Sequence, residues 1–318
     1  MVIKFPRFSY WPAVVLLLLP AQFLLAQATD SVLLFSYFKG NGEDGLHFAY
    51  SKDGLSWTAL RNDQSFLTPA VANDKLMRDP CIARGPNGEF HLVWTVSWND
   101  KGIGYASSKD LINWSAQEFL PVMQKEPTAL NTWAPELFYD TDSRQFMLYW
   151  SSTIPGRFKA TDGYGDDNYN HRIYYTLTRD FKTFTPTALL YDKGFNVIDA
   201  SIYKAGQQYI MLLKDETLKP EAQKNIRTAV SQTLTGPYSA PSAPISGKTW
   251  AEGPTMIHHL GYWWLYYDQY STHRYACQRS ADLKTWENLS QQLKFPAGAR
   301  HGTVIKISAE EFKRIKQP

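Results

Sequence analysis

The chain has 318 residues, a length that allows one large domain or two smaller ones. Its formal net charge is only +3 and 20% of its residues are charged, without a basic run or an acidic tail, so the composition excludes a dedicated nucleic-acid-binding protein. Aromatic residues make up 15% of the chain, which in a polar sequence is typical of aromatic-rich β-sheet and of surfaces that stack on sugar rings.

Residues 1–28 are predicted to be a cleaved secretory signal. Two basic residues precede an apolar run at 11–25, and Ala-Gln-Ala at 26–28 offers small residues for cleavage. A transmembrane anchor is the alternative, but two prolines interrupt the run and it is short for a membrane span. No cysteine lies near the cleavage point, which argues against a lipoprotein anchor. We therefore expect a secreted or periplasmic mature protein, residues 29–318, with no remaining membrane attachment.

Beyond residue 30 the sequence predicts β-strands. Aromatic and β-branched runs bounded by Gly, Asn or Asp occur at 90–95, 145–150 and 262–267. An apolar period typical of a helix is absent until the last turn near Glu310. The fold class is therefore expected to be all-β.

A short pattern recurs along the predicted strands: Ser or Thr, any residue, Asp, then an apolar and an aromatic residue. Clear copies lie at 51–57, 108–114, 178–184 and 280–286, and a weaker copy lies at 231–238. The copies are roughly 50–70 residues apart, which is typical of propeller blades with loop insertions. The pattern predicts a five-bladed β-propeller of four-stranded sheets, in which the repeated Asp holds a turn and the repeated aromatic residue packs between blades.

The two ends of the mature chain are predicted to share one blade. Residues 302–307 have the pattern of an innermost strand with no partner after it, and residues 32–38 have that of a second strand with no first. Pairing the two would close the ring, so residues 29–318 are expected to form one domain. A polar segment rich in Gly and Asp at 157–170 is expected to form a rim near the functional face.

The chain has two cysteines, Cys81 and Cys277, which are far apart in sequence. An export signal would permit a disulfide, but two cysteines cannot form a disulfide framework. Two separate buried thiols are the favoured interpretation.

The start of each predicted innermost strand carries a chemically active side chain. We interpret four of the five starts as placing a carboxylate at an equivalent position and the fifth as placing a histidine: Asp79, Glu136, Asp199, Glu252 and His301. Each residue alone would be an ordinary strand end, but gathered carboxylates repel one another and raise pKa values. A scaffold that keeps such a cluster uses it, for catalysis or to bind a cation. We expect these side chains to converge at one mouth of the central channel.

Hydrolysis of a glycosidic bond is one chemistry that fits such a cluster. One carboxyl group must donate a proton to the leaving oxygen, while a second must stay ionised and activate water or attack directly. A third acid can tune the proton donor by its charge. The cluster has enough acids for all three tasks, and aromatic surroundings suit a sugar ring.

An ordered set of short motifs resembles glycoside hydrolase family 43 over about residues 32–307: Asp79-Pro80, Trp133-Ala134-Pro135-Glu136, Ile198-Asp199, Glu252-Gly253-Pro254 and His301-Gly302. That family is a five-bladed propeller of inverting arabinofuranosidases, xylosidases, arabinanases and exo-galactosidases. The resemblance implies that Asp79 is the general base, that Glu252 is the general acid, and that Asp199 raises the pKa of the acid and holds it in place.

The same resemblance implies roles for the remaining residues. Trp133 and Glu136 would lie near the substrate, and Arg300 would reach a sugar hydroxyl or modulate the acid. His301 matches the axial histidine that holds a water or a hydrated calcium ion in many members. No cofactor is expected to be required, and a structural calcium ion at that histidine is an optional addition. The sequence departs from the family in placing residues 32–60 before the first acid and in having Ala200 where Pro is usual.

Several alternatives stay open. Invertase-like propellers also use an Arg-Asp-Pro motif, with a retaining mechanism. In those proteins the Arg-Asp-Pro motif follows an Asn-Asp-Pro motif, whereas in this sequence the Arg-Asp-Pro at residues 78–80 comes first among the acids. Within family 43 an exo-acting α-L-arabinofuranosidase is the first choice, followed by a β-xylosidase and an exo-β-galactosidase. A non-catalytic carbohydrate-binding propeller and a structural propeller that holds a cation are the other hypotheses. The expected partner is a carbohydrate, and a monomer is expected.

Overall fold

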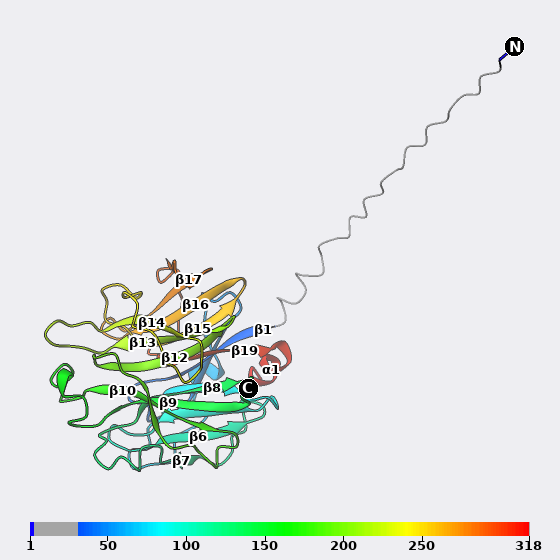
Figure 1. Ribbon diagram of the computed structural model, residues 1–318. Helices are drawn as coiled ribbons and strands as arrows, with labels where there is room; N and C mark the ends of the chain where they lie inside the picture. Colours follow the sequence, from blue (N-terminus) through cyan, green and yellow to red (C-terminus); the bar gives the residue numbers. More distant parts are fainter. Residues whose placement is uncertain (3–30, 318) are drawn as a thin grey trace. The chain divides into compact units, whose positions relative to one another are not determined.

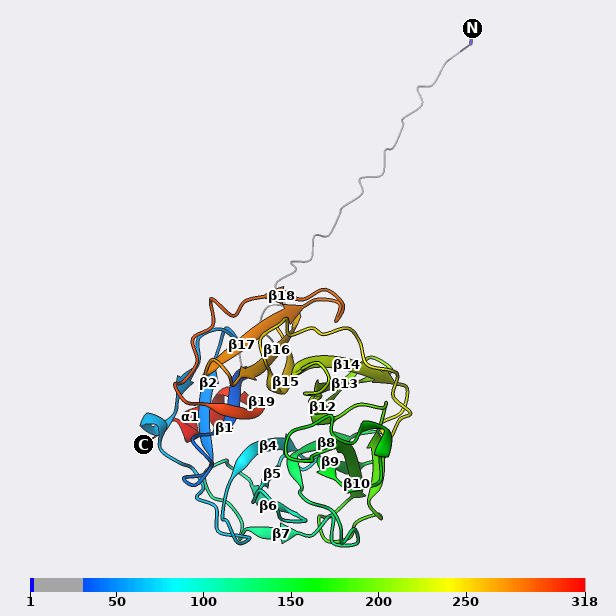
Figure 2. The ribbon, with the colours of Figure 1, turned by 90° about the vertical axis from the view of Figure 1, so that its left-hand side faces the viewer.

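The computed structural model describes residues 1–2 and 31–317, so the predicted signal segment lies almost wholly outside the described residues. Within 31–317 the aromatic and β-branched runs form strands, as predicted, and the strands group into five antiparallel sheets. Figure 1 shows these sheets from the side, and Figure 2 shows them arranged around a common axis. The predicted five-bladed, all-β propeller is therefore confirmed.

Each blade begins with its innermost strand at the axis and continues outward. The first blade contains β4 (Arg78–Arg84), β5 (Phe90–Thr95), β6 (Ile103–Ser108) and β7 (Glu118–Leu120). The second contains β8 (Trp133–Asp140), β9 (Gln145–Thr153), β10 (His171–Thr178) and β11 (Ala188–Tyr191). The third contains β12 (Val197–Ala205), β13 (Gln208–Asp215) and β14 (Asn225–Ser231). The fourth contains β15 (Glu252–His259), β16 (Tyr262–Gln269), β17 (Arg274–Ser280) and β18 (Glu287–Asn288).

The fifth blade is built from both ends of the described chain. Its order is β19 (Arg300–Ser308), β1 (Ser31–Phe38), β2 (His47–Ser51) and β3 (Thr58–Ala59). Strand β1 pairs antiparallel with β19, so that Val32 lies opposite Ile307. Each innermost strand contacts the next, and β19 contacts β4, which closes the ring as expected.

The third blade departs from the predicted four strands because prolines interrupt its outer edge. The segment at 239–245 runs beside β14, and its amides at Ser239, Ser242 and Ile245 donate to carbonyl groups of that strand. These donors are three residues apart, whereas a regular strand would donate at every second residue. Pro241 and Pro244 have no N–H group to complete the ladder, so a fourth strand does not form.

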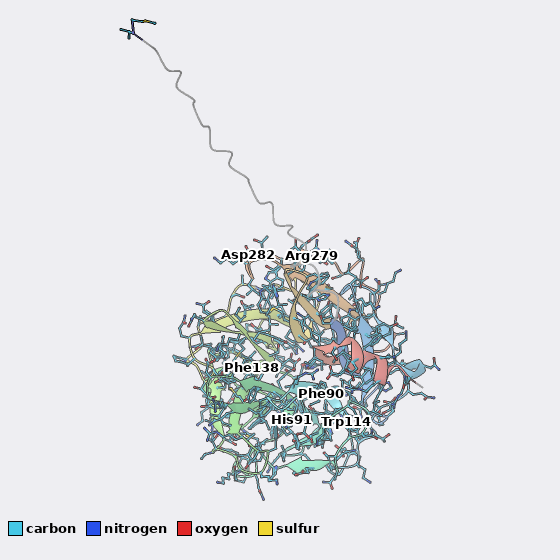
Figure 3. All side chains as sticks on the ribbon, turned by 90° about the vertical axis from the view of Figure 1, so that its right-hand side faces the viewer. Phe90, His91, Trp114, Phe138, Arg279 and Asp282 are labelled. Carbon is cyan, nitrogen blue, oxygen red and sulfur yellow. The ribbon has the colours of Figure 1, made fainter. Side chains whose placement is uncertain are left out.

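The repeated turn has the structural role that was predicted. In the first copy, Asp53 Oδ1 accepts hydrogen bonds from the amides of Leu55 and Ser56 at 2.8 and 2.7 Å. The other three clear copies repeat this pattern, and Asp282 of the last copy lies at the outer edge of the propeller (Figure 3). The aromatic residue packs between blades, since the ring of Trp57 lies 5.5 Å from that of Tyr266 in the neighbouring blade. The repeat therefore builds the scaffold and lies away from the functional site.

Apolar side chains between neighbouring blades form the core, and both cysteines belong to it. Cys81 and Cys277 are buried and free, which confirms the interpretation as two separate thiols. The single α-helix of the described residues, α1 (Ala309–Ile315), follows β19 and begins at a capping box between Ser308 and Glu311. No helix of the described part of the chain is both long and apolar enough to cross a membrane.

Candidate active site

All five innermost strands begin with a β-bulge. In the first blade Arg78 lies opposite Thr95 and Cys81 lies opposite Val93, so the two residues between them are left out of the pairing. Equivalent shifts occur in the other four blades. The bulge turns the backbone into the left-handed region at Asp79, with φ of 52°. Ala134, Asp199 and Gly253 share this conformation in their blades. A bulge re-aims side chains, so each strand start points its residues at the axis.

The bulges correct the interpretation that four carboxylates occupy one equivalent position. Counted from the start of each bulge, Glu252 is a first residue, Asp79 and Asp199 are second residues, and Glu136 is a fourth. The acids therefore enter the channel at different levels. The alternating side-chain pattern of a strand does not predict this difference in level, because the bulge inserts extra residues that the sequence pattern does not mark.

Six of the seven predicted site residues line one cavity of about 220 Å³ at the axis: Asp79, Trp133, Asp199, Glu252, Arg300 and His301. They come from all five blades, as the sequence predicted. Glu136 does not line the cavity. It is 5% exposed and lies within the channel, where Cys81 Sγ donates to its Oε2 at 3.2 Å and Thr303 Oγ1 donates to its Oε1 at 3.3 Å.

The environment of Asp79 keeps it ionised. Burial alone would raise its pKa, but His301 Nδ1 lies 3.2 Å from its Oδ1 and Arg78 is its neighbour in the chain. Thr95 Oγ1 also donates to its Oδ2 at 2.8 Å. Together these groups lower the pKa of Asp79 to about 2. A carboxylate that stays charged can accept a proton from water.

Glu252 is held between two cations. Arg300 Nη2 lies 2.8 Å from its Oε1, and Lys214 Nζ lies 3.2 Å from its Oε2. Burial opposes ionisation of this carboxyl, but Lys214 and Arg300 outweigh burial and lower its pKa. In the ligand-free protein, Glu252 is therefore a carboxylate.

Asp199 is close enough to both of these acids for their charges to act on it. The amide of Gly253 donates to its Oδ2 at 3.0 Å, and its own amide donates to Ser151 Oγ at 3.2 Å. Burial raises the pKa of Asp199 to about 6, with the negative charges of Glu252 and Asp79 adding to the rise. The opposing positive charges of His301 and Lys214 do not cancel it. Because the pKa of Asp199 is raised and that of Glu252 is lowered, Asp199 is the first of the two to take up a proton as the pH falls.

Aromatic rings form one side of the cavity. Trp133 and Trp98 meet edge to face with ring centroids 5.5 Å apart, and Trp133 Nε1 donates to the Trp98 carbonyl at 2.9 Å. Trp98 is 42% exposed, so its ring is available to a ligand. Tyr169, within the segment 157–170 that was expected at the rim, packs against Trp133 with ring centroids 4.7 Å apart.

Sequence reasoning missed the residues that the second strands contribute. Thr95, Lys214 and Asp268 each lie directly opposite the first residue of a bulge. Thr95 and Lys214 line the cavity, whereas Asp268 Oδ2 pairs with Arg300 Nε at 2.7 Å. A signal was present, because each of these polar residues comes at the end of an apolar strand. Glu216, Trp98 and Tyr270 follow the ends of second strands and also line the cavity.

The residues present do not fit a directly bound calcium ion. Among the described residues, no group of three or more His, Cys, Asp or Glu side chains is arranged to hold a metal ion. His301 Nδ1 is already paired with Asp79 and lies 3.9 Å from Asp199 Oδ2. Burial would lower the pKa of His301, but Asp199 and Asp79 raise it to about 9, so the imidazole itself carries a positive charge at this point.

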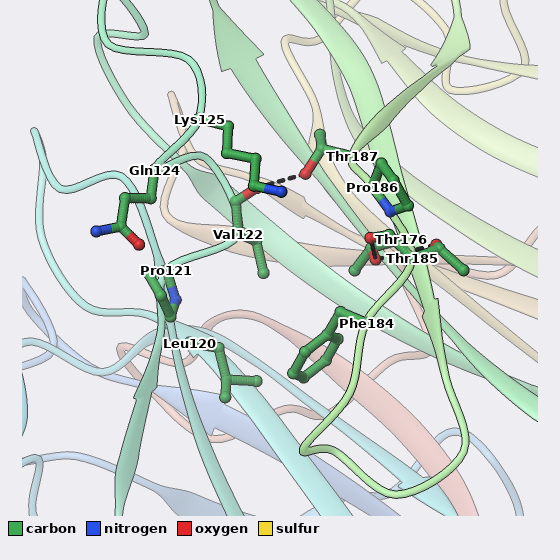
Figure 4. Close-up of a pocket in the computed structure, with 10 residues that line it drawn as sticks. All are labelled: Leu120, Pro121, Val122, Gln124, Lys125, Thr176, Phe184, Thr185, Pro186 and Thr187. Carbon is green, nitrogen blue, oxygen red and sulfur yellow. Dashed lines mark hydrogen bonds between the residues drawn. The ribbon is translucent and has the colours of Figure 1, made fainter.

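Another cavity, of about 290 Å³, lies between the end of β7 with the segment that follows it and residues 184–187, which lead from β10 to β11 (Figure 4). It has no carboxyl or imidazole group among its lining residues: Leu120, Pro121, Val122, Gln124, Lys125, Thr176, Phe184, Thr185, Pro186 and Thr187. This cavity therefore lacks the converging carboxyl groups of the axial cavity.

A five-bladed propeller with carboxylates of separate blades around a small aromatic-sided cavity has the design of a carbohydrate-active protein. Comparison with known proteins agrees. A family profile related to glycoside hydrolase family 43, described as "Probable glycosyl hydrolase domain", matches residues 31–313. The chain belongs to this family of glycosyl hydrolases.

Individual relatives are distant. An α-L-arabinofuranosidase of Bifidobacterium longum subsp. longum is 26% identical over 184 residues, which cover 52% of this chain and 17% of that protein. The matched part is thus a small fraction of the length of that relative. A thermostable family-43 glycoside hydrolase superposes with a TM-score of 0.55 at 18% identity, covering 73% of this chain and 80% of the other. The family-43 protein BlXynB of Bacillus licheniformis gives a TM-score of 0.55 at 15% identity, covering 85% and 54%. These two structures support the fold alone.

Proposed function

We propose that this protein is an exported, inverting glycoside hydrolase that removes terminal α-L-arabinofuranosyl units from plant-type polysaccharides or oligosaccharides. The observation that carries the proposal is the pair Asp79 and Glu252 in one cavity, with Asp199 hydrogen-bonded beside Glu252. Asp79 is held as a carboxylate, and the strand that carries His301 contacts both the strand of Asp79 and that of Glu252. Two carboxyl groups of opposite task around one sugar ring are what glycoside hydrolysis requires.

In the proposed reaction Asp79 takes a proton from a water molecule as the water oxygen bonds to the anomeric carbon. Protonated Glu252 gives its proton to the glycosidic oxygen as the bond from that oxygen to the anomeric carbon breaks. Asp199 raises the pKa of Glu252 by its charge and fixes the neighbouring backbone through the Gly253 amide. Arg300 and Trp133 position the sugar. Proton exchange with solvent then restores both acids.

The size of the cavity supports exo action. Its volume of about 220 Å³ is below the range of roughly 300–1,000 Å³ that larger ligands occupy, so it suits one terminal sugar ring. The arabinofuranosyl choice is supported by the resemblance of the matched segment to a protein named α-L-arabinofuranosidase. A β-xyloside and an exo-cleaved β-galactoside are the alternative substrates.

The test is a screen of the purified protein on nitrophenyl α-L-arabinofuranoside, β-D-xyloside and β-D-galactoside. We expect release from the arabinofuranoside, and NMR of the first product should show the inverted anomer. Asp79→Asn and Glu252→Gln should each lower kcat by about 10²–10⁴-fold, the usual contribution of a general base or acid. Normal turnover by both variants would refute the assignment, and a retained anomer would refute inversion.

A non-catalytic carbohydrate-binding propeller is the second candidate, and one observation favours it. In the ligand-free protein Glu252 is ionised and paired with both Lys214 and Arg300, so it has no proton to donate. Binding of an arabino-oligosaccharide by the wild type, measured by calorimetry, without any product on prolonged incubation would select this candidate.

Export is a separate part of the proposal. The composition of residues 1–28 supports it, and a polysaccharide substrate would be met outside the cytoplasm. N-terminal sequencing of the protein recovered from the periplasm or medium should give Thr29 as the first residue.

A further inference from the structure

The candidate acid is one link in a chain of alternating charges that crosses the rim of the cavity. Each of its three cations contacts two carboxylates: Arg300 contacts Asp268 and Glu252, Lys214 contacts Glu252 and Glu216, and Lys224 contacts Glu216 and Asp166. The contacts at Glu252 are unequal, because Arg300 lies 2.8 Å from Oε1 and Lys214 lies 3.2 Å from Oε2. Oε2 is therefore the more weakly held oxygen.

Lys214 is placed by the scaffold at this oxygen. It is 2% exposed, and it belongs to β13 opposite Ile198, the first residue of the third bulge. Its ammonium nitrogen lies 2.6 Å from Glu216 Oε2 and 4.6 Å from the centre of the Tyr270 ring. An ammonium group has three donors, so Lys214 can keep Glu216 and the ring while it releases Glu252.

We propose that Lys214 is a positioning residue for the acid: it competes with a proton for Glu252 Oε2 and so sets the upper pH limit of the reaction. This inference depends on the proposed function, in which Glu252 protonates the leaving oxygen. A proton from solvent adds to Oε2 when the ammonium shifts toward Glu216, and no proton leaves Lys214. The same proton is then transferred to the glycosidic oxygen as its bond to the anomeric carbon breaks.

Charged and titratable groups from every neighbouring element act on Glu252, and they differ in sign. The positive groups are Lys214 of β13 with Arg300 and His301 of β19. The negative or titratable groups are Asp199 of β12, Asp268 of β16 and Tyr270 after β16. Behind them, Asp79 of β4 acts on Asp199, and Glu216 after β13 acts on Lys214. A positive neighbour favours the ionised carboxyl and lowers its pKa, so removal of Lys214 raises that pKa. The alkaline limb of activity, where the acid loses its proton, must then move to higher pH.

The test compares the pH dependence of kcat/KM for wild type, Lys214→Met and Glu216→Gln on the nitrophenyl glycoside that the wild type cleaves. Lys214→Met keeps the length of the side chain without its charge, and its alkaline limb should move up by about one pH unit. Glu216→Gln frees Lys214 to bind Glu252 more closely, so its limb should move down. Opposite shifts from two neighbouring residues would not result from loss of structure.

Lys204→Met is the matched control. Lys204 lies on the same blade and pairs with Asp142 at 2.6 Å, away from the cavity, so its pH profile should match that of the wild type. Unshifted limbs in both Lys214→Met and Glu216→Gln would overturn the inference while leaving the hydrolase intact. If Lys214→Met does not fold, the direction of the Glu216→Gln shift decides alone. A silent wild type or a fully active Glu252→Gln variant would instead refute the proposed function.

Discussion

Among single residues, Glu136 shows that a shift of two positions along a strand changes the role of a carboxyl group. Asp79 and Asp199 are second residues of their bulges and reach the cavity, whereas Glu136 is a fourth residue and enters the channel. Burial raises its pKa to about 7, even though His301, Cys81 and Thr303 favour the charged form. Glu136 thus accepts hydrogen bonds from residues of two other blades and links those blades, which is a structural role.

The substitution Glu136→Gln tests this view. The pKa of Glu136 rises from 4.5 to about 7 on folding, so the folded state binds the proton more tightly and the stability due to this group is lost as pH rises from 4.5 to 7. A glutamine does not titrate, so the difference in unfolding free energy between pH 5 and pH 8 should shrink by on the order of 3 kcal/mol. Denaturant unfolding at both pH values measures it. A large rise in KM without this change in the pH dependence of stability would instead indicate that Glu136 contacts the substrate.

Among elements, the bulge is what converts a propeller blade into part of a site. The third blade shows the arrangement: the bulge at Ile198 places Asp199 at the cavity, and the opposite strand adds Lys214. Gly253 of the fourth bulge is packed so closely that an added Cβ would lie 2.4 Å from His301 Cγ. Its φ of +57° is also one that other residues adopt at a cost.

The substitution Gly253→Ala should therefore do more than strain the backbone. His301 would have to move, and its contact with Asp79 would be lost, so we expect kcat/KM to fall about 10²-fold. Gly206→Ala is the control, because Gly206 has a φ of +60° but no atom within 4 Å of an added Cβ. Both variants should lose about 1–2 kcal/mol of stability from the left-handed backbone, and only Gly253→Ala should lose activity. Equal activity in both would contradict the role of close packing at His301.

The sequence predicts which strands and blades form better than it predicts how deep each side chain lies in the channel. The repeated Asp turn and the unpaired ends at 32–38 and 302–307 are local patterns, and the five blades with their shared closure followed from them. The set of acids was also visible, since Asp79 and Glu252 are in conspicuous motifs. The depth of Glu136 and the cation at Lys214 were not predicted, because both depend on register across a bulge. Register is a property of paired strands and is not written in either strand alone.

At the scale of the whole molecule, the ring is closed in two places: within the fifth blade and at the junction of the fifth blade with the first. The antiparallel pairing of β1 with β19 completes the fifth blade. Helix α1 then covers the junction, because Ile315 is fully buried in one apolar cluster with residues of both blades, among them Phe48 and Phe90. Glu311 of the same helix pairs with Arg84 of the first blade at 2.7 Å.

The two contacts of α1 should contribute very differently to closure. Ile315→Ala removes a fully buried side chain at the junction, so the free energy of unfolding should fall by about 2–5 kcal/mol. Glu311→Gln weakens a partly exposed ion pair, which should cost at most about 1 kcal/mol. Thermal and urea unfolding measure both, and kcat below the transition should equal that of the wild type because the cavity lies at the axis. If Ile315→Ala were as stable as Glu311→Gln, the pairing of β1 with β19 would close the ring without the helix.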